Sequence, residues 1–343
     1  MIVLGLESSC DETAVALVTA DRQILAQRVA SQMEVHGPFG GVVPELAARA
    51  HVERMAPMVE AVLDEAGVAL EMVDAIAATA GPGLVGALMV GLVSGQALAF
   101  AADRPFVPVN HLEAHALSPR LVDADLSFPY LLLLVSGGHC QLIGVEAVGR
   151  YRRLATTIDD AAGEAFDKVA KLLGLGFPGG PAVEATARGG DPAAVPLPRP
   201  LLGSGEPHFS FAGLKTAVLR AVESGRHAPA DIAASFQAAV TDCLVDRSAR
   251  ALSSFPQATA LVAAGGVAAN TAIRTALAAL ANRHGLPLVV PPPALCTDNA
   301  AMVAWAAIER RQAGLPHDAE MPARPRWPLD PEAAPVRGAG VKA

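Results

Sequence analysis

Two histidines spaced four residues apart are the feature of this sequence that most directly suggests chemistry. His111 and His115 lie in the run Asn110-His111-Leu112-Glu113-Ala114-His115. Residues four apart share one face of a helix, so both imidazoles could bind one metal ion; two ordinary histidines at a helix start are the alternative. Glu113 is about 200° around a helix from His111 and faces away. A zinc protease needs its glutamate directly after the first histidine, so the spacing argues against a metallopeptidase.

A third ligand would have to come from a distant part of the chain. Cys296-Thr297-Asp298-Asn299 follows three prolines and begins the last expected helix. An aspartate at this place can cap the helix N-terminus or bind a metal, and the residues alone leave both roles open. If Asp298 is a ligand, two histidines and one carboxylate leave open coordination positions, as in non-haem iron sites and catalytic zinc sites.

Three turns of small residues, each after an expected strand, could hold phosphate. They are Ser8–Glu12, Ser136–His139 and Gly265–Asn270. Glycine lets backbone N–H groups approach anionic oxygens closely, and a following helix start adds a favourable dipole. Together the turns suggest a nucleotide held between two lobes, although none matches a P-loop or a dinucleotide-binding pattern.

The segment from Asp159 to Lys171 mixes acidic and basic residues at helical spacing. The pairs Glu164 with Lys168 and Asp167 with Lys171 are four residues apart, which is typical of a solvated helix face with weak ion pairs. The next segment, 176–181, is rich in glycine and proline and is predicted to be a rigid turn that could close over a ligand.

Strands and helices must position these groups. Apolar runs at 2–6 and 13–19, joined by a polar turn, predict a β-hairpin, and the same pattern returns at 130–135 and 140–145 as a weak internal repeat. Helical patterns alternate with strands in both halves, which indicates an α/β protein. The expected helices are 43–67, 83–103, 160–174, 213–224, 231–253 and 298–312.

Composition bounds the class of protein. A chain of 343 residues exceeds what one hydrophobic core usually supports, so two lobes are expected. The net charge of −8 would repel nucleic acid, so any RNA contact must come from local basic patches or from a partner. Four well-separated cysteines without a CxxC pair fit a reducing cytoplasm.

One segment is apolar enough to be considered for membrane spanning. Leu84 to Ala102 carries no charge, but glycines and polar residues dilute its apolarity. We therefore expect a helix buried between a sheet and a second layer, and no membrane contact. The first strand is followed by acidic residues, which does not fit a signal peptide.

The motifs, in this order, resemble the universal tRNA threonylcarbamoyladenosine transferase family in its bacterial form, formerly called the glycoprotease family. The resemblance covers roughly residues 1–328. It rests on the segments 7–13, 111–115, 135–139, 159–168, 177–181, 210–215, 265–270 and 296–299.

This resemblance implies the two-lobed actin-like ATPase fold of sugar kinases, heat-shock chaperones and actin, with duplicated lobes. Lobe I would be 1–128 joined by the returning helix at 298–325, lobe II 129–297, and the tail 326–343. The implied reaction moves a threonylcarbamoyl group from threonylcarbamoyl-AMP to the N6 amine of the adenosine next to the anticodon, in tRNAs that read codons beginning with A, and releases AMP.

The resemblance also implies the site residues and partners. His111, His115 and Asp298 would bind one divalent metal ion per subunit, with iron(II) favoured and zinc(II) possible, and Asp11 and Glu12 are candidates to orient or deprotonate the amine. The residues implied to bind the donor are Val135, Ser136, Gly137, Gly138, His139, Asp167, Gly180, Glu184 and Asn270. The implied partners are tRNA, an inactive paralogue of the same fold and a small P-loop ATPase, all in the cytoplasm.

Three other functions can be weighed against this one. A metallopeptidase conflicts with the position of Glu113. A non-catalytic scaffold paralogue should lack the histidines and Asp298, which are present. In a sugar kinase of the same fold the histidine pair would have no task.

Overall fold

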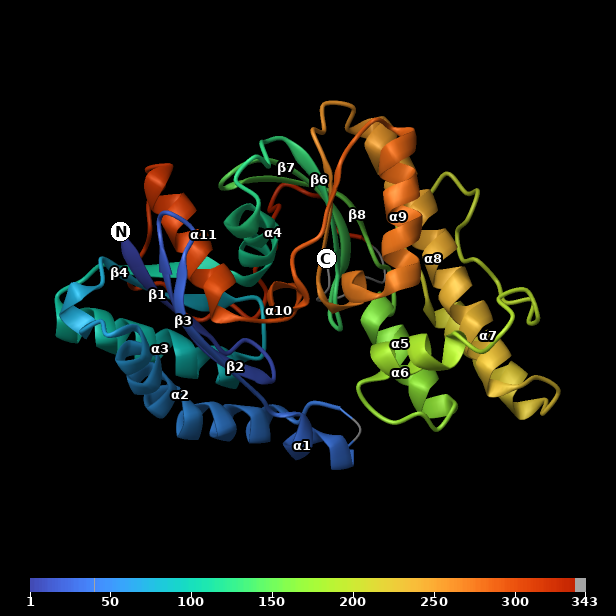
Figure 1. Ribbon diagram of the computed structural model, residues 1–343, viewed down its shortest axis with the longest axis horizontal. Helices are drawn as coiled ribbons and strands as arrows, with labels where there is room; N and C mark the ends of the chain where they lie inside the picture. The colour runs from blue at the N-terminus through green and yellow to red at the C-terminus, as the bar shows by residue number, and fades with distance from the viewer. Residues whose placement is uncertain (40, 337–343) are drawn as a thin grey trace. The chain divides into compact units, whose positions relative to one another are not determined.

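The computed structural model describes residues 1–39 and 41–336 and divides the chain into two units (Figure 1). The first unit comprises Met1–Asp125 and Thr297–Leu329, and the second comprises Leu126–Cys296 and the chain from Asp330 onward. Of the segment expected as a tail, residues up to Leu329 group with the first unit and those from Asp330 with the second. Residues 337–343 lie outside the described residues.

A five-stranded sheet with the order β3-β2-β1-β4-β5 forms the centre of the first unit. Its strands are β1 (Ile2–Glu7), β2 (Glu12–Thr19), β3 (Ile24–Ser31), β4 (Ala75–Gly81) and β5 (Phe106–Asn110). The first three are antiparallel neighbours, whereas β4 runs parallel to β1, and β5 parallel to β4. The central strands β1 and β4 read as continuous apolar runs because helices cover both faces of the sheet.

The helices of the first unit lie in two layers. α2 (Pro44–Ala66) and α3 (Val85–Ala102) pack on one face of the sheet, and α11 (Ala300–Gln312) packs on the other beside α4 (His111–Val122) (Figure 1). Gly5 on β1 allows this packing, because a Cβ there would lie 2.4 Å from the carbonyl oxygen of Ala300. Shorter helical turns are α1 (Met33–His36), η1 (Gly37–Phe39) and η2 (Leu70–Met72).

The expectation that α3 is buried on both sides is wrong. Its inner face packs on the sheet, but Val85, Met89 and Val93 are more than half exposed, and Phe100 is 90% exposed. Among the described residues, α3 is the one helix long and apolar enough to cross a membrane by length and composition, and 33% of it is buried. Composition could not show which face of so uniformly apolar a helix is covered.

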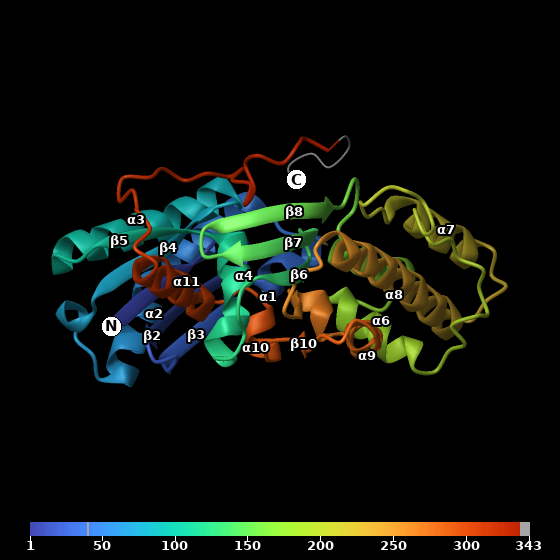
Figure 2. The same cartoon turned by 90° about the horizontal axis from the view of Figure 1, so that it is seen from above.

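The second unit repeats the topology of the first. Its sheet has the order β10-β9-β6-β7-β8, with β6 antiparallel to β7, β7 antiparallel to β8, and β9 and β10 parallel to β6. Figure 2 shows β6, β7 and β8 side by side. The hairpin repeat predicted from the sequence is therefore part of a duplicated five-stranded sheet. The strands are β6 (Tyr130–Val135), β7 (Cys140–Ala147), β8 (Arg150–Thr156), β9 (Leu261–Ala264) and β10 (Leu288–Val289).

Helices supply most of the core of the second unit. Phe166 of α5 meets Phe236 of α8 edge to face at 5.0 Å, and both rings are buried. The predicted rigid turn at 176–181 is shorter than expected, because Gly179 begins a helix. The helices are α5 (Ala162–Leu172), α6 (Gly179–Ala187), α7 (Ala212–Glu223), α8 (Pro229–Ser254), η3 (Gly266–Ala269), α9 (Thr271–Arg283) and α10 (Pro293–Cys296).

Candidate metal centre and donor site

The two histidines are positioned by the junction of β5 and α4. Asn110 ends the strand and caps the helix, because its side-chain oxygen accepts hydrogen bonds from the N–H groups of Leu112 and Glu113. His111 is therefore the first residue of α4, and His115 lies one turn later on the same face. Both are buried, with exposures of 5% and 1%.

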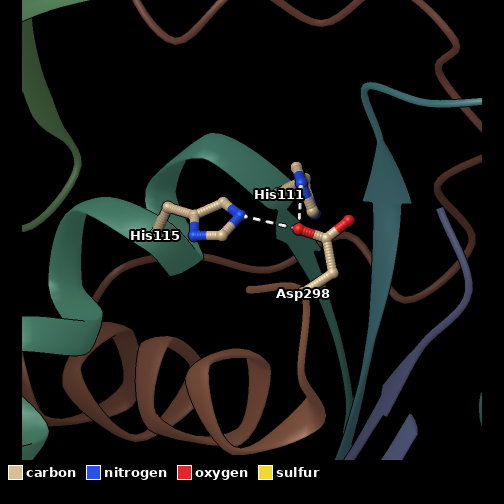
Figure 3. A group of neighbouring side chains, drawn as sticks. All are labelled: His111, His115 and Asp298. Atoms are coloured by element: carbon tan, nitrogen blue, oxygen red, sulfur yellow. Dashed lines mark hydrogen bonds and ion pairs between the residues drawn. The ribbon is translucent and has the colours of Figure 1, made fainter. Parts of the chain in front are cut away.

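Asp298 reaches these histidines from the segment before α11. Its Oδ1 lies 3.0 Å from Nε2 of His115 and 3.5 Å from Nε2 of His111 (Figure 3). The N-cap of α11 is Asn299, whose side chain accepts a hydrogen bond from the N–H of Met302. Because Asn299 takes the capping role that the sequence left open, the Asp298 carboxylate is available to the histidines.

A buried carboxylate supports the first histidine from behind. Oε2 of Glu7, at the end of β1, lies 3.1 Å from Nδ1 of His111, and the hydroxyl of Ser9 lies 3.2 Å from the same nitrogen. Glu7 also accepts hydrogen bonds from the hydroxyl of Thr79 and the N–H of Ser9. Burial raises the pKa of Glu7, but the charge and hydrogen bond of His111 outweigh it and bring the pKa below its ordinary value. Glu7 is therefore an ionised partner for the imidazole.

The donor set fits a divalent metal ion. When Nδ1 of His111 donates its proton to Glu7, Nε2 presents a lone pair to the carboxylate of Asp298. Two acceptors facing each other need a proton or a cation between them. A proton is bound readily here, because Asp298 and Glu7 overcome the effect of burial and raise the pKa of His111 to about 9. The three ligand atoms lie within 4.8 Å of one another, so one ion could contact all of them.

His115 is held differently from His111. Nδ1 of its ring is buried and has no hydrogen-bond partner among the described residues, so its polar contact is the one that Nε2 makes with Asp298. The carboxylate of Glu7 thus orients His111, whereas a bound ion would have to orient His115.

The residues expected to act on the amine are Asp11, in the turn after the Ser8–Ser9 segment, and Glu12, the first residue of β2. Burial raises the pKa of Glu12 to about 9, with further contributions from the charges of Asp298 and Asp11. A cation bound at Asp298 would offset one of these contributions, so this pKa does not choose between the orienting and the deprotonating role of Glu12. Burial also raises the pKa of the neighbouring Cys10 thiol above its ordinary value.

Glu113 faces away from the metal ligands, as its spacing predicted. Its carboxylate forms an ion pair with Arg310 of α11 at 2.9 Å. The arrangement that a zinc protease requires is thus absent from this helix.

In the second unit, the turn from Val135 to His139 is tightly packed by glycines from two other segments. A Cβ on Gly163 would lie 2.6 Å from the carbonyl oxygen of Ser136. A Cβ on Gly265, whose φ is +95°, would lie 2.3 Å from the carbonyl oxygen of Val135. Gly137 and Gly138 at the tip are exposed. Two of the three predicted turns, those at 136–139 and 265–270, therefore lie together in this unit.

The other residues expected to bind the donor lie at helix N-termini or form hydrogen bonds with them. Asp167 accepts a hydrogen bond from the N–H of Gly179 at the start of α6, and Glu184 accepts one from Thr271 at the start of α9. Asn270 caps α9 through Ile273 and donates to Gln237 of α8. Apart from its chain neighbours and the backbone of its own helix, no described atom lies within 4 Å of a Cβ built on Gly180.

A cavity of about 310 Å³ lies beside Asn270. It is bordered by α6, α8 and the start of α9, and Gln237, Thr241 and Ala272 are among its lining residues. Its volume is at the lower end of the roughly 300–1,000 Å³ typical of small-molecule sites.

The charged side chains of α5 and of the residues before it form more ion pairs than the sequence predicts. Glu164 pairs with Lys168 at 2.7 Å, as predicted, but Asp160 binds both Lys168 and Lys215, at 3.0 and 2.9 Å. Burial raises the pKa of Asp160, yet the hydrogen bonds and charges of the two lysines bring it below its ordinary value. Asp160 thus joins α5 to α7.

Comparison with known proteins identifies the family. The family model described as tRNA N6-adenosine threonylcarbamoyltransferase matches residues 23–305. A protein of that name from Sphingopyxis alaskensis is 71% identical over 342 residues, covering 100% of this chain and 99% of the relative. The chain belongs to the tRNA N6-adenosine threonylcarbamoyltransferase family. A member from Zymomonas mobilis is 65% identical, covering 100% of this chain and 95% of the relative.

Family membership confirms the resemblance drawn from the ordered motifs. The chain is an acyltransferase that places a threonylcarbamoyl group on the N6 amine of a tRNA adenosine. None of these matches favours the metallopeptidase or the non-catalytic scaffold.

Solved structures of distant proteins confirm the fold. HypF from T. kodakarensis superposes with a TM-score of 0.63 at 16% identity, covering 93% of this chain and 48% of that one. Component A of the (R)-2-hydroxyglutaryl-CoA dehydratase from Acidaminococcus fermentans gives 0.55 at 16% identity, covering 91% and 99%. The predicted actin-like ATPase fold with duplicated sheets is therefore correct.

Proposed function

We propose that His111, His115 and Asp298 bind one divalent metal ion, iron(II) in preference to zinc(II), and that this ion serves the transfer of the threonylcarbamoyl group from threonylcarbamoyl-AMP. The observation that carries the proposal is the convergence of one atom from each of two buried histidines and one carboxylate oxygen of the half-buried Asp298 within 4.8 Å. The acceptor is the N6 amine of the adenosine next to the anticodon, in tRNAs that read codons beginning with A.

The reaction is an acyl transfer. The amine nitrogen attacks the carbamoyl carbon, the bond from that carbon to the phosphate oxygen breaks, and AMP leaves with the electron pair while the amine loses a proton. When bound, the ion supplies positive charge that holds phosphate or carboxylate oxygens of the donor and stabilises charge in the transition state.

The residues around the proposed ion have separate tasks. Glu7 holds the Nδ1 proton of His111 and so keeps Nε2 free for the ion. Asp11 is the proposed group that accepts the amine proton, and Glu12 is the proposed group that orients the substrate.

In the second unit we propose that the turn from Val135 to His139 binds the acyl phosphate part of the donor and that Asn270 binds its adenosine part. The exposed glycines of the turn present backbone N–H groups, which suit anionic oxygens. The cavity beside Asn270 has room for a base, and the open space at Gly180 would admit a ligand atom. Asp167 and Glu184 lie near this proposed donor site, where each accepts a hydrogen bond from the first N–H of a helix, α6 for Asp167 and α9 for Glu184.

Partners complete the proposal. A chain with net charge −8 is expected to bind tRNA weakly by itself. We propose that an inactive paralogue of the same fold docks on the exposed apolar side of α3, formed by Val85, Met89 and Val93, and that a small P-loop ATPase joins them in the cytoplasm.

The proposed metal site is tested with the variant His111→Ala/His115→Ala. We expect it to lose bound iron or zinc and to lose transfer, measured as the mass of nucleosides from tRNA incubated with threonylcarbamoyl-AMP and the partner proteins. The control, His284→Ala/His317→Ala, removes two exposed histidines. Metal content and activity equal to those of the control would show that the histidines have another role.

A further inference from the structure

The hydroxyl of Ser8 is inserted into the backbone of helix α3. Its Oγ donates a hydrogen bond to the carbonyl oxygen of Ala87 at 2.8 Å and accepts one from the N–H of Gly91 at 3.1 Å. In a regular α-helix these two backbone groups pair with each other. Ser8 is 1% exposed, so water does not compete for these hydrogen bonds.

The next residue connects the same helix to the proposed metal centre. The carbonyl oxygen of Ser9 accepts a hydrogen bond from the N–H of Leu84, the residue before α3. The hydroxyl of Ser9 contacts Nδ1 of His111, and its N–H donates to Glu7. Three backbone groups at the start of α3, from Leu84, Ala87 and Gly91, therefore form hydrogen bonds with the Ser8–Ser9 segment. The same segment contacts both Glu7 and His111.

We propose that Ser8 is a positioning residue that couples α3 to the metal centre. It fixes Ser9, and Ser9 in turn sets the position of Glu7 and the orientation of the His111 ring. This inference rests on the proposed metal site. It assigns a task to α3 that a helix merely covering the sheet would not have.

The shape of the contact makes the proposal testable. A Cβ on Gly91 would lie 2.4 Å from Oγ of Ser8 but 3.4 Å from its Cβ, with Met55 next at 3.8 Å. Gly91→Ala should therefore push the Ser8 hydroxyl away, whereas the same change in a Ser8→Ala background meets only ordinary van der Waals contact. In Ser8→Ala itself, Ala87 and Gly91 can pair with each other, so the helix should remain intact.

The experiment is a double-mutant cycle on the full chain, with Ser8→Ala, Gly91→Ala and their combination, and with Ser94→Ala on the same helix as control. The readouts are the Kd for Zn²⁺, the absorption spectrum of bound Co²⁺, the thermal unfolding midpoint, and the ¹⁵N chemical shifts of the His111 ring without added metal. We expect Gly91→Ala to weaken Zn²⁺ binding about tenfold and to shift the His111 resonances, and to do neither in the Ser8→Ala background.

An equal effect of Gly91→Ala in both backgrounds would overturn the coupling through Ser8. So would unfolding midpoints that fall while the Zn²⁺ Kd and the His111 resonances stay unchanged. If the unaltered chain binds neither Zn²⁺ nor Co²⁺, the proposed metal site fails, and the His111 resonances still decide whether Ser8 positions the ring.

Discussion

Replacing Glu7 by glutamine changes the support of the first histidine while keeping the size of the side chain. Glu7 is fully buried, and its carboxylate accepts hydrogen bonds from Thr79 and the N–H of Ser9 and holds Nδ1 of His111. Glutamine offers a single acceptor oxygen and turns an NH₂ group toward one of these donors. The variant therefore weakens the hold on the imidazole and leaves a buried polar group without an acceptor.

The size of both effects follows from the burial of the site. Loss of a partner behind a metal-binding histidine typically lowers metal affinity about 10- to 100-fold. We expect the larger value, about 100-fold or roughly 2.7 kcal/mol, because no solvent reaches Glu7 to replace its charge. The unsatisfied group should also lower the free energy of unfolding by about 1–3 kcal/mol.

Competition for Zn²⁺ with a chromophoric chelator measures the affinity, and thermal unfolding measures the stability. Glu113→Gln is the matched control, because Glu113 is also buried but pairs with Arg310 and faces away from the ligands. It should lose stability and keep its Zn²⁺ affinity. The reasoning is wrong if Glu7→Gln binds Zn²⁺ as tightly as the unaltered chain, or if both variants lose affinity equally.

Three further predictions concern the second unit and the partners. Asp160→Asn should lower the free energy of unfolding by roughly 1 kcal/mol, because it weakens the pairing with two lysines. Because the pKa of Asp160 is lowered in the folded chain, this difference in stability should be constant above pH 3.8, the ordinary pKa of an aspartate, and should vanish as the pH falls through the lowered pKa. Acid unfolding curves of the variant and the unaltered chain measure the difference. Asn270→Ala should weaken binding of a non-hydrolysable donor analogue and cost about 1 kcal/mol as a lost helix cap. Asn270→Asp should keep the cap but lose the contact with the analogue and the hydrogen bond to Gln237, and calorimetry and unfolding together separate these effects. Binding of tRNA to the isolated chain should be weak at physiological salt and strengthen with the two partner proteins, and tight binding by the chain alone would refute the partner requirement.

Local patterns in the sequence were enough to predict the histidine pair and the duplicated hairpins, because both depend on the period of a single helix or strand. Glu7 was not recognised as the support of His111, since the two residues are 104 positions apart and meet only through the sheet. The choice between helix cap and metal ligand for Asp298 was also beyond the sequence, because only the structure shows that the neighbouring Asn299 caps the helix.

The amino-acid composition of two elements of the second unit, β8 and α6, made them difficult to predict from the sequence. β8 is an edge strand whose basic residues, Arg150 to Arg153, resemble a surface patch more than a strand. α6 begins with Gly179, Gly180 and Pro181, which predict a turn. The carboxylate of Asp167 satisfies the N–H of Gly179 and stabilises this unusual helix start.

The most direct test of the account is metal-dependent transfer by the purified chain. The protein, stripped of metal, is incubated with tRNA, threonylcarbamoyl-AMP and the partner proteins, with and without added iron(II), and the nucleosides are identified by mass. We predict that N6-threonylcarbamoyladenosine forms when iron(II) is added and that His111→Ala/His115→Ala makes none under the same conditions. Equal amounts of product with and without metal, or from the variant, would contradict the central claim.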